Sequence, residues 1–580
     1  MFGSNLKALE KINKSLANKI SRIPLKEVLG HISAVKNEKN EYILVKDKNY
    51  IDDTPSPELA AKEVYSQNIK TAISRHDFIV IFGLGLGNLL DYTHQQSMCS
   101  LILYEPDLNI LRFTFEYVDL TKYFADGRLY VTDNIHECTN YIYEKYLLDD
   151  KIEFVYLKNY LLQHTSEFNL LTERVFEVCK NKIIDMNTTK KHSKNWVKNS
   201  LINASANYSH YPINIFINKF KDKTALILGA GPSLKDNLEK IKQYRDKFVI
   251  FAVHRTLDTL KNSGIMPDFC VIIDTNWVQK NITKDLKYLE QINFIADLKA
   301  DSYISSLNFK NIFTYYPQNS ILAEKLETKL PEEVKCLETG GTSTICAYNC
   351  AKLMGFKNLI FAGTDLAFKE GTAYCDGKIT TANNSNSVKI QNVIRQTTKV
   401  KSVTGEYVET REDYAGFIKQ FEIFFAKDKT SNIYNLSEFG AFINGMKYKS
   451  LDEICVKINA MEVSVNDIIN DTVFENEEIA EKIKNATKTI LQEEYAKIKP
   501  IANAVNEWFE MYSQHPSFFD YAAKIIPMIT STMILQDAVQ IELIKFSKLV
   551  LSTNEQERKE FLEDLFKTIL EYAKNLDNLI

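Results

Sequence analysis

The residues best suited to hold a ligand follow an apolar run, TALIL, that ends at residue 228. They are Gly229, Ala230, Gly231, Pro232 and Ser233. Glycine lets a backbone turn sharply and come close to a ligand, and proline is tolerated at the first position of a helix. Free N–H groups at a helix start favour a phosphate, and the serine hydroxyl can add a donor. The segment therefore predicts a phosphate-binding turn, with a tight turn that holds no ligand as the alternative.

Polar residues also follow later apolar runs. His254 follows FAV, Asp274 follows VII, and Gly363 and Asp365 lie in FAGTD. In an open parallel sheet, ligands bind beyond the carboxyl ends of the strands. We therefore expect these residues to meet the glycine turn at one edge of a sheet.

A second polar turn, ETGGTS, precedes the helical segment TICAYNCAKLM. Its small hydroxyls and free N–H groups make it a second place where an anion can bind. The residues expected to contact the ligand here are Thr339, Gly340, Gly341, Thr342 and Ser343.

A third glycine-rich turn, GLGLG, occupies residues 83–87, and Glu105 ends the next apolar run. Glycines followed by an acidic residue about 20 positions later are typical of methyltransferase-type cofactor sites, where the carboxylate binds ribose hydroxyls. No catalytic motif follows in 130–185. We therefore favour a Rossmann-like scaffold with an empty site, used for docking an acceptor, over a cofactor site.

The elements that must position these residues form two α/β series. Strands alternate with helices in roughly 65–185 and again from 224 to 365, which predicts parallel sheets. From about 466 the apolar spacing becomes purely helical, with Pro500, Pro516 and Pro527 as expected breaks. We expect an N-terminal Rossmann-like domain at 1–185, a linker helix at 186–215, a central Rossmann-like, sialyltransferase-like domain at 216–465 and an all-α region at 466–580.

Composition excludes several classes of protein. The 580 residues carry a net charge of −4, which argues against bulk nucleic-acid binding. No apolar run of about 18 residues and no signal-peptide core are present, so we expect a cytoplasmic protein that does not insert into membranes. The nine cysteines form no C-x-x-C pair. Cys346 and Cys350 could supply half a metal site, but two buried residues on one helix face are the favoured interpretation.

These motifs resemble the flagellar motility-accessory-factor (Maf) glycosyltransferases. The resemblance rests on GAGPSLK, on His254 and Asp274, and on ETGGTSTICAYNCAKLMGFKNLIFAGTDLAF. The spacing of Trp196, Asn199 and Asn203 fits the same family. The core is also similar to bacterial family 42 sialyltransferases. The resemblance implies transfer of a CMP-activated nonulosonic acid, pseudaminic or legionaminic acid, to Ser or Thr of flagellin, in support of flagellum assembly and motility.

The resemblance also implies roles for individual residues. The glycine turn would hold the phosphate side of the cytidine nucleotide, and His254 and Asp274 stand where the sialyltransferases place donor-binding asparagines. Tyr374 matches a tyrosine that helps the phosphate to leave. The second such tyrosine is missing, because Ala367 and Phe368 occupy that stretch.

The general base is a further departure from the sialyltransferase pattern. Those enzymes use a histidine beyond the G-x-D strand, and here no histidine lies between His254 and His515. Asp365 and Asp376 are the first candidates, because they flank the predicted site; Glu409 and Asp413 follow. His254 could also serve, although its place at a strand end suits donor binding better.

Two other functions stay open at this point. One is a 6-hydroxymethylpterin pyrophosphokinase-like enzyme, which shares the glycine turn and G-x-D but has no need of extra domains. The other is a non-catalytic flagellin-binding protein. No cofactor or metal is expected, since no D-x-D motif lies at a strand end of the core. For flagellin docking we expect the C-terminal helices, with the aromatic residues Trp508, Phe509, Tyr512, Phe518, Phe519 and Tyr521.

Overall fold

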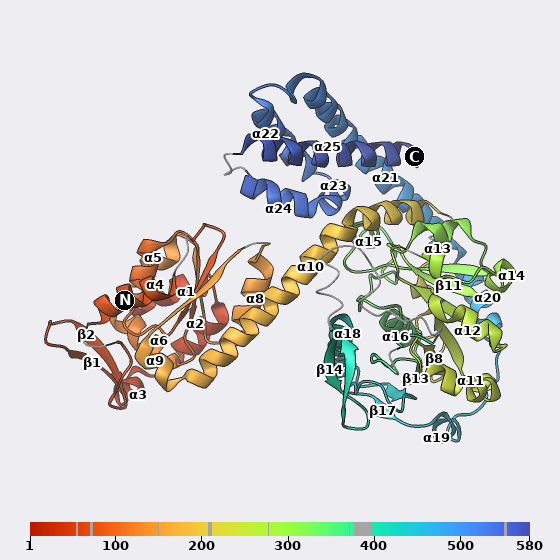
Figure 1. Ribbon diagram of the computed structural model, residues 1–580, viewed down its shortest axis with the longest axis horizontal. Coiled ribbons are helices and arrows are strands. Elements are labelled where there is room, and N and C mark those ends of the chain that lie inside the picture. Colours follow the sequence, from red (N-terminus) through yellow and green to blue (C-terminus); the bar gives the residue numbers. More distant parts are fainter. Residues whose placement is uncertain are drawn as a thin grey trace. The chain divides into compact units, whose positions relative to one another are not determined.

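The structure is a computed structural model that describes residues 1–53, 56–69, 73–147, 150–206, 211–276, 278–369, 372–375, 397–549 and 554–579. The chain divides into two compact units, which we call the N-terminal unit (Met1–Lys190) and the C-terminal unit (Lys191–Ile580) (Figure 1). The division falls inside one long helix, α10 (Thr165–Ser205), which contains most of the expected linker helix. The finer domain boundaries at 185, 215 and 465 stay predictions.

The N-terminal unit is built on a parallel sheet with strand order β6-β5-β4-β7. Its strands are β4 (Phe78–Phe82), β5 (Ser100–Tyr104), β6 (Leu129–Thr132) and β7 (Ile152–Tyr156). The charged hairpin forms an antiparallel sheet of β1 (Ile32–Lys36), β2 (Tyr42–Lys46) and β3 (Asn49–Tyr50). The helices are α1 (Phe2–Glu10), α2 (Lys14–Ser21), α3 (Leu25–Leu29), α4 (Pro57–Asn68), α5 (Asn88–Gln96), α6 (Leu108–Tyr117), α7 (Thr121–Ala125), α8 (Ile135–Lys145) and α9 (Lys158–Gln163).

The C-terminal unit is built on an eight-stranded sheet of order β12-β11-β10-β9-β8-β13-β16-β17, in which every pair is parallel. The strands are β8 (Thr224–Leu228), β9 (Val249–Val253), β10 (Phe269–Ile272), β11 (Asn293–Asp297), β12 (Asn311–Tyr315), β13 (Asn358–Ala362), β16 (Asn432–Asn435) and β17 (Lys447–Tyr448). The order runs outward from β8 in one direction and resumes at β13 in the other. The topological switch point, where ligands bind in such sheets, therefore lies between β8 and β13.

Helices cover both faces of this sheet, which explains the nearly continuous apolar strands. Alternate residues face opposite layers: Ala225 and Ile227 pack in one core, Leu226 and Leu228 in the other. The helices up to residue 455 are α11 (Leu234–Gln243), α12 (Leu257–Asn262), α13 (Val278–Asn281), α14 (Leu286–Leu289), α15 (Ile321–Glu327), α16 (Ser343–Leu353), α18 (Glu412–Lys427) and α19 (Leu451–Cys455). The α/β fold class with parallel sheets and a helical C-terminal region is confirmed.

One element was absent from the sequence-based strands. An antiparallel hairpin, β14 (Thr397–Lys401) and β15 (Tyr407–Arg411), leads directly into α18. Its strands are mostly exposed and polar, so they lack the apolar pattern by which the sheet strands were found. The end of this hairpin reaches the predicted site.

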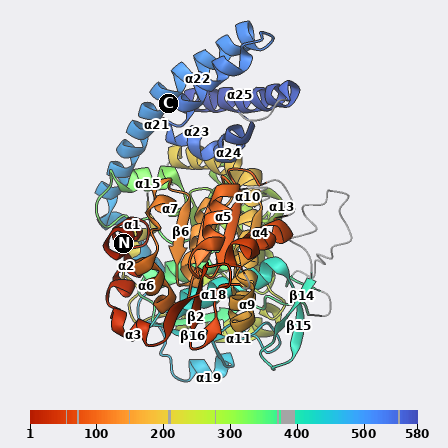
Figure 2. The same cartoon turned by 90° about the vertical axis from the view of Figure 1, so that its left-hand side faces the viewer.

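The C-terminal helices share a core with the rest of their unit (Figures 1 and 2). They are α20 (Val465–Glu475), α21 (Glu477–Glu507), α22 (Phe518–Ile529), α23 (Met533–Ala538), α24 (Gln540–Leu549) and α25 (Glu555–Asp577). One cluster joins α21–α25 to Leu201 of α10 and to Leu322 of α15. The expectation that prolines break these helices was wrong at two places, since Pro500 lies inside α21 and Pro527 inside α22.

The aromatic residues expected to dock flagellin belong to this core. Trp508 is fully buried, and its indole N–H donates to the Phe518 carbonyl at 2.8 Å. Phe518 is buried as well, and the other four pack against the same cluster. Their role in folding therefore accounts for their presence. Among the described residues, no helix is long and apolar enough to cross a membrane.

Candidate functional site

The glycine turn after β8 closes against the neighbouring strand β13. Gly229 N–H donates to the Ala362 carbonyl and Gly231 N–H to the Gly363 carbonyl, both at 2.8 Å. A Cβ on Gly231 would lie 2.7 Å from the Gly363 oxygen and would also collide with the Asp365 carboxylate. These glycines are thus required by a close approach of two backbone segments at the switch point.

Asp365 takes the place at the helix start that the sequence suggested for a phosphate. One carboxylate oxygen accepts from the Ser233 N–H at 2.8 Å, and the other accepts from the Ser233 hydroxyl at 2.5 Å. The helix start of α11 therefore already has a negative partner from the chain itself. The roles of Gly229, Ala230, Gly231, Pro232 and Ser233 in donor binding stay predictions.

The environment of Asp365 suits a positioning group. The side chain is 1% exposed, and burial raises its pKa above the usual value, although hydrogen bonds from Ser233 and Ser437 oppose the shift. Its backbone carbonyl accepts from the Ala441 N–H at 2.7 Å. Asp365 thereby ties the β8 turn to the segment after β16, and its predicted catalytic role stays a prediction.

His254 and Asp274 do come together, as expected from neighbouring strands. Nδ1 of His254 lies 3.5 Å from a carboxylate oxygen of Asp274. This Nδ1 is buried and has no hydrogen-bond partner among the described residues. Burial lowers the pKa of His254, and the nearby Asp274 charge opposes that shift. A buried ring nitrogen without a partner is a rare feature that suits a ligand contact.

Thr364 is a second such group at this edge. Its buried hydroxyl has no hydrogen-bond partner among the described residues. It lies next to the β8 turn, because a Cβ on Gly229 would be 3.1 Å from it. Sequence reasoning passed over Thr364 in favour of its two neighbours, Gly363 and Asp365.

The ETGGTS turn lies where α16 begins, and α16 packs on β8, β9 and β10. Thr342 caps the helix by accepting from the Ile345 N–H at 3.1 Å, so its hydroxyl has a structural role. Gly340 packs against Ile345, and Gly341 has a φ of +71° that favours glycine. A helix between parallel strands runs back along them, so this turn lies at the same carboxyl edge. Ligand contacts by Thr339 to Ser343 stay a prediction.

Tyr374 lies beside the β8 turn, because the next residue, Cys375, donates its N–H to the Ala230 carbonyl at 2.7 Å. The Arg255 guanidinium carbon stands 3.9 Å from the centre of the Tyr374 ring. On the other side, Tyr414 from the start of α18 shares a side-chain hydrogen bond with Tyr374. Burial, and next the charge of Tyr374, raise the pKa of Tyr414 above the usual value.

A second tyrosine, Tyr414, therefore lies near Tyr374, although the sequence pattern predicted none. Tyr414 comes from α18 and not from the stretch of Ala367 and Phe368. Its ring carries the Arg411 guanidinium carbon at 4.1 Å, and Arg411 also pairs with Asp413 through Nε at 2.8 Å. Sequence reasoning missed Arg255, Arg411 and Tyr414, because only folding brings the hairpin end to β9.

The other candidate carboxylates divide into three cases. Asp413 is held by Arg411, and Glu409 is exposed on β15. Asp376 lies outside the described residues. Among the described residues, no cluster of three or more His, Cys, Asp or Glu side chains could hold a metal ion.

Asn199 and Asn203 shape the loops around the site. Asn199 donates to the Thr275 carbonyl at 3.0 Å and to the Lys299 carbonyl at 3.2 Å. Asn203 donates to the carbonyls of residues 298 and 300. The two amides on one face of α10 therefore hold the loops that follow β10 and β11. Trp196 covers the Lys299 ammonium at 5.0 Å.

The glycine turn of the N-terminal unit, residues 83–87, is filled by the chain itself. A Cβ on Gly83 would lie 2.6 Å from the Tyr160 ring, and one on Gly85 would collide with Asp52. Glu105 is fully buried and accepts from the Leu84 N–H at 2.9 Å and from the Tyr160 hydroxyl. This carboxylate therefore faces the protein and not a ribose, which agrees with the scaffold interpretation.

A cavity of about 810 Å³ in the N-terminal unit adjoins this turn, because Leu86 and Asn88 are among its lining residues. Its lining combines apolar and aromatic side chains with Glu41 and Glu58. No lysine or arginine is among its lining residues, which makes it poorly suited to a phosphate. The cavity belongs to the N-terminal unit, whereas the sheet edge described above belongs to the C-terminal unit.

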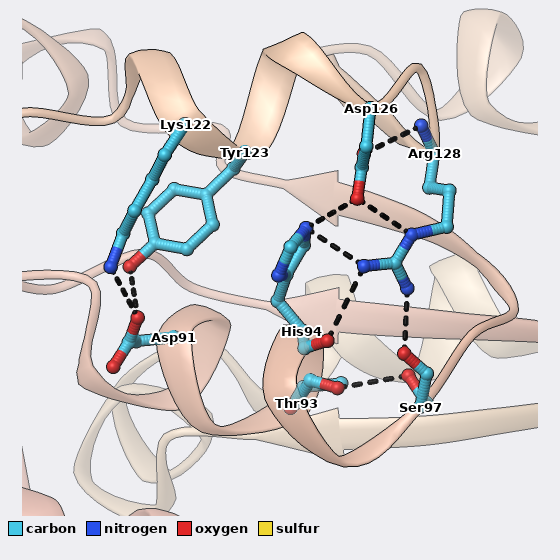
Figure 3. Close-up of polar contacts among 8 residues, drawn as sticks. All are labelled: Asp91, Thr93, His94, Ser97, Lys122, Tyr123, Asp126 and Arg128. Carbon is cyan, nitrogen blue, oxygen red and sulfur yellow. Dashed lines mark hydrogen bonds and ion pairs between the residues drawn. The ribbon is translucent and has the colours of Figure 1, made fainter.

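A polar cluster between α5 and the segment before β6 is also structural (Figure 3). His94 and Arg128 share Asp126, at 2.8 and 2.7 Å. Asp91 holds Lys122 and Tyr123 in the same view. Because these charged groups bind one another, the cluster braces two helices and leaves no charge free for a ligand.

Comparisons with known proteins bear on the C-terminal unit and on the whole chain. Residues 198–371 match a family model described as 6-hydroxymethylpterin diphosphokinase MptE-like. An uncharacterized protein of Treponema pallidum (strain Nichols) is 38% identical over 85 residues, which are 15% of this chain. The matched stretch spans 40% of that relative's length.

A solved structure covers far more. The MAf glycosyltransferase from Magnetospirillum magneticum AMB-1 superposes with a TM-score of 0.66, over 100% of this chain and 96% of that one. The chain has the fold of that glycosyltransferase. The two sequences are 14% identical, so the likeness establishes the architecture, including the N-terminal unit and the helical region. The resemblance read from the motifs is confirmed at this level.

Proposed function

We propose that the chain is a glycosyltransferase that moves a nonulosonic acid, pseudaminic or legionaminic acid, from a CMP-activated donor to Ser or Thr of flagellin. The observation that carries the proposal is the full-length fold match to a Maf glycosyltransferase. A match limited to the core would fit any enzyme built on that core. A shared N-terminal unit and helical region favour a common type of acceptor, and we propose cytoplasmic action on flagellin before assembly.

The reaction needs three events at the carboxyl edge of the sheet. The acceptor hydroxyl oxygen attacks the anomeric carbon, the bond from that carbon to the phosphate oxygen breaks with its electrons leaving on CMP, and the hydroxyl proton passes to a base. We propose that Tyr374 donates a hydrogen bond to the departing phosphate. Nδ1 of His254 and the Thr364 hydroxyl are buried and have no hydrogen-bond partner among the residues that the structure describes. They support our proposal that the donor binds across β8, β9 and β13.

The proton acceptor is to be chosen among Asp365, Asp376 and His254. Asp365 is already occupied by Ser233, whereas His254 keeps a buried ring nitrogen beside the Asp274 carboxylate. The variants Asp365→Asn, Asp376→Asn and His254→Gln, compared by their pH–rate profiles, separate the three. The base is the residue whose loss removes the acidic limb of the profile while CMP affinity is kept.

The direct experiment mixes the purified protein, a CMP-nonulosonic acid and flagellin, and weighs the intact flagellin. We expect a mass increase by whole nonulosonic acid residues, with free CMP as the second product. The same reaction in EDTA should proceed at the same rate, since we propose a reaction without metal. Flagellin of unchanged mass, under conditions where the protein is folded and binds flagellin, would instead support a non-catalytic flagellin-binding protein.

A second candidate function follows from the family model over 198–371. A 6-hydroxymethylpterin diphosphokinase would transfer a diphosphate from ATP to the pterin and release AMP. Incubation with ATP and 6-hydroxymethylpterin tests this directly. AMP formation that depends on the pterin would overturn the glycosyltransferase proposal.

A further inference from the structure

The helix start at the glycine turn after β8 does not offer a free positive end. Asp365 accepts both the Ser233 N–H and its hydroxyl, at 2.8 and 2.5 Å, and its side chain is 1% exposed. A phosphate brought to the same N–H group would meet a carboxylate held in place by two hydrogen bonds. The anionic part of a ligand at this edge must therefore find its positive partner elsewhere.

Arg255 is that partner by position and by charge. It follows His254 at the end of β9 and is half-buried. Its guanidinium lies over the Tyr374 ring at 3.9 Å, and no carboxylate among the described residues pairs with it. Asp274, in the segment after β10, has a carboxylate oxygen 3.5 Å from Nδ1 of His254.

The surroundings hold Arg255 in a fixed place. Tyr374 is anchored beside the β8 turn by the hydrogen bond from Cys375 to Ala230, 2.7 Å long. Tyr414 backs Tyr374 from the start of α18, and Arg411 covers the Tyr414 ring. An arginine stacked on an aromatic ring keeps its planar donors free to meet an anion in two parallel hydrogen bonds.

The two arginines of this corner differ in their partners. Arg411 is compensated by Asp413, with Nε and Oδ1 2.8 Å apart, whereas no carboxylate of the described residues pairs with Arg255. The buried His254 Nδ1 and Thr364 hydroxyl, both without a hydrogen-bond partner among the described residues, lie on the same strand ends. The Arg255 guanidinium thus stacks on the Tyr374 ring at an edge where polar atoms without described partners also lie.

We infer that Arg255, braced by Tyr374 and Tyr414, binds the anionic group of the donor and fixes it at the end of β9. The inference rests on the proposed function for the identity of the donor. Two groups of a CMP-nonulosonic acid have the required chemistry, the phosphate and the sugar carboxylate. The phosphate is tetrahedral and the carboxylate is planar, and a guanidinium can bind either of them through two oxygens.

The test measures binding to the full chain by calorimetry, with CMP, cytidine, free nonulosonic acid and inorganic pyrophosphate as probes. Arg255→Met should weaken binding of CMP about tenfold or more and leave cytidine unchanged, because a hydrogen-bonded ion pair is lost. Arg255→Lys should recover part of the affinity. If the sugar carboxylate is the partner, the free nonulosonic acid will lose affinity and CMP will not.

Controls keep folding and function apart. Arg174→Met removes an exposed arginine of α10 in the N-terminal unit and should change no affinity. Far-ultraviolet circular dichroism and melting temperature establish that Arg255→Met is folded. Equal affinities of Arg255→Met and the unchanged protein for CMP, nonulosonic acid and pyrophosphate would overturn the inference.

The failure of the proposed function gives a different result. In that case flagellin stays unmodified and CMP does not bind, yet pyrophosphate binding that depends on Arg255 would still show the anion site. If neither CMP nor pyrophosphate binds the folded protein, the anion site is absent and the inference falls by itself.

Discussion

The two glycine turns of this chain stand at equivalent places in their sheets. The turn at 83–87 follows β4 beside β7, and the turn at 229–233 follows β8 beside β13. In both units the segment after the neighbouring strand places a residue against the turn, Tyr160 of α9 in the first and Asp365 in the second. Glycine at a switch point therefore marks a close approach of backbone, and that approach can be made by the chain itself.

The difference between the turns lies in the charges around them. The first turn is surrounded by the buried carboxyls of Asp52 and Glu105, and burial raises the pKa of each to about 7. Near the second turn, Arg255 stacks on Tyr374, and the buried His254 Nδ1 and Thr364 hydroxyl have no hydrogen-bond partner in the described part of the chain. We therefore expect the polar groups around a glycine turn, and not the glycines themselves, to distinguish a ligand site from a scaffold.

The strongest way to test the shared part of this comparison is Gly231→Val with Gly85→Val. The sequence suggested that valine at 231 would displace phosphate in a folded protein. The structure places the Gly363 carbonyl and Asp365 at that position, and Gly85 has both a φ of +52° and Asp52 as neighbour. We expect each substitution to cost at least about 3 kcal/mol of stability, measured by urea unfolding.

Gly416→Ala is the matched control, because nothing lies within 4 Å of the Cβ that it adds inside α18. It should leave the free energy of unfolding unchanged or slightly higher. A stable Gly231→Val protein that has lost CMP binding would show instead that the turn is open to a ligand.

A smaller effect concerns the pH dependence of the first turn. The pKa of Glu105 is about 7 in the folded protein and 4.5 when unfolded, so its contribution to stability is full below pH 4.5 and is lost as the pH rises through 7. We expect Glu105 alone to account for a loss on the order of 3 kcal/mol in the N-terminal unit between pH 4.5 and 8, beside the loss due to Asp52. Hydrogen exchange of β4 and β5 amides, corrected for intrinsic rates, measures it.

Glu105→Gln should remove the Glu105 share of that pH dependence and leave the share of Asp52, and Glu10→Gln, at an exposed position, should change neither. A protein whose N-terminal unit gains stability as the pH rises over this range would contradict the buried, proton-binding state of Glu105.

A double-mutant cycle measures how firmly Asp365 is held. Ser233→Ala and Asp365→Asn should each destabilise the C-terminal unit, with a coupling of about 1–3 kcal/mol, because they share a hydrogen bond to a charged group. Tryptophan fluorescence during urea unfolding reports on this unit, since all three tryptophans lie beyond residue 190. Ser205→Ala, which loses a bond to its own helix, is the additive control.

Most of the fold was readable from the sequence, because buried parallel strands leave apolar runs such as FIVIF and TALIL. Those runs coincide with β4 and β8. The hairpin β14–β15 was not predicted, since its strands are largely exposed and polar and lack the apolar runs of the buried sheet strands. The continuation of α21 through Pro500 also went against local preference, because packing in the shared core outweighs one lost hydrogen bond.

The candidate site was readable only in part. Strand ends gave His254 and Asp274, which do meet at 3.5 Å. The local sequence pattern could not show that the Asp365 carboxylate accepts hydrogen bonds from Ser233, because the two residues lie 132 positions apart. For the same reason the pairing of Tyr374 with Arg255 and Tyr414 has no signature in the sequence. Contacts between distant segments decide which polar residues remain free.

The smallest expected effect is the absence of one. S-adenosylmethionine should leave the melting temperature of the full chain unchanged at millimolar concentration. The Leu84 N–H already donates to Glu105 at 2.9 Å and the Leu86 N–H to Asp52 at 3.1 Å, so these two donors are not available to a cofactor. CMP, by contrast, should raise the melting temperature through the C-terminal unit by mass action. A saturable stabilisation by S-adenosylmethionine that Tyr160→Trp abolishes would show that the first turn opens for a ligand, and the distinction drawn between the two turns would then fail.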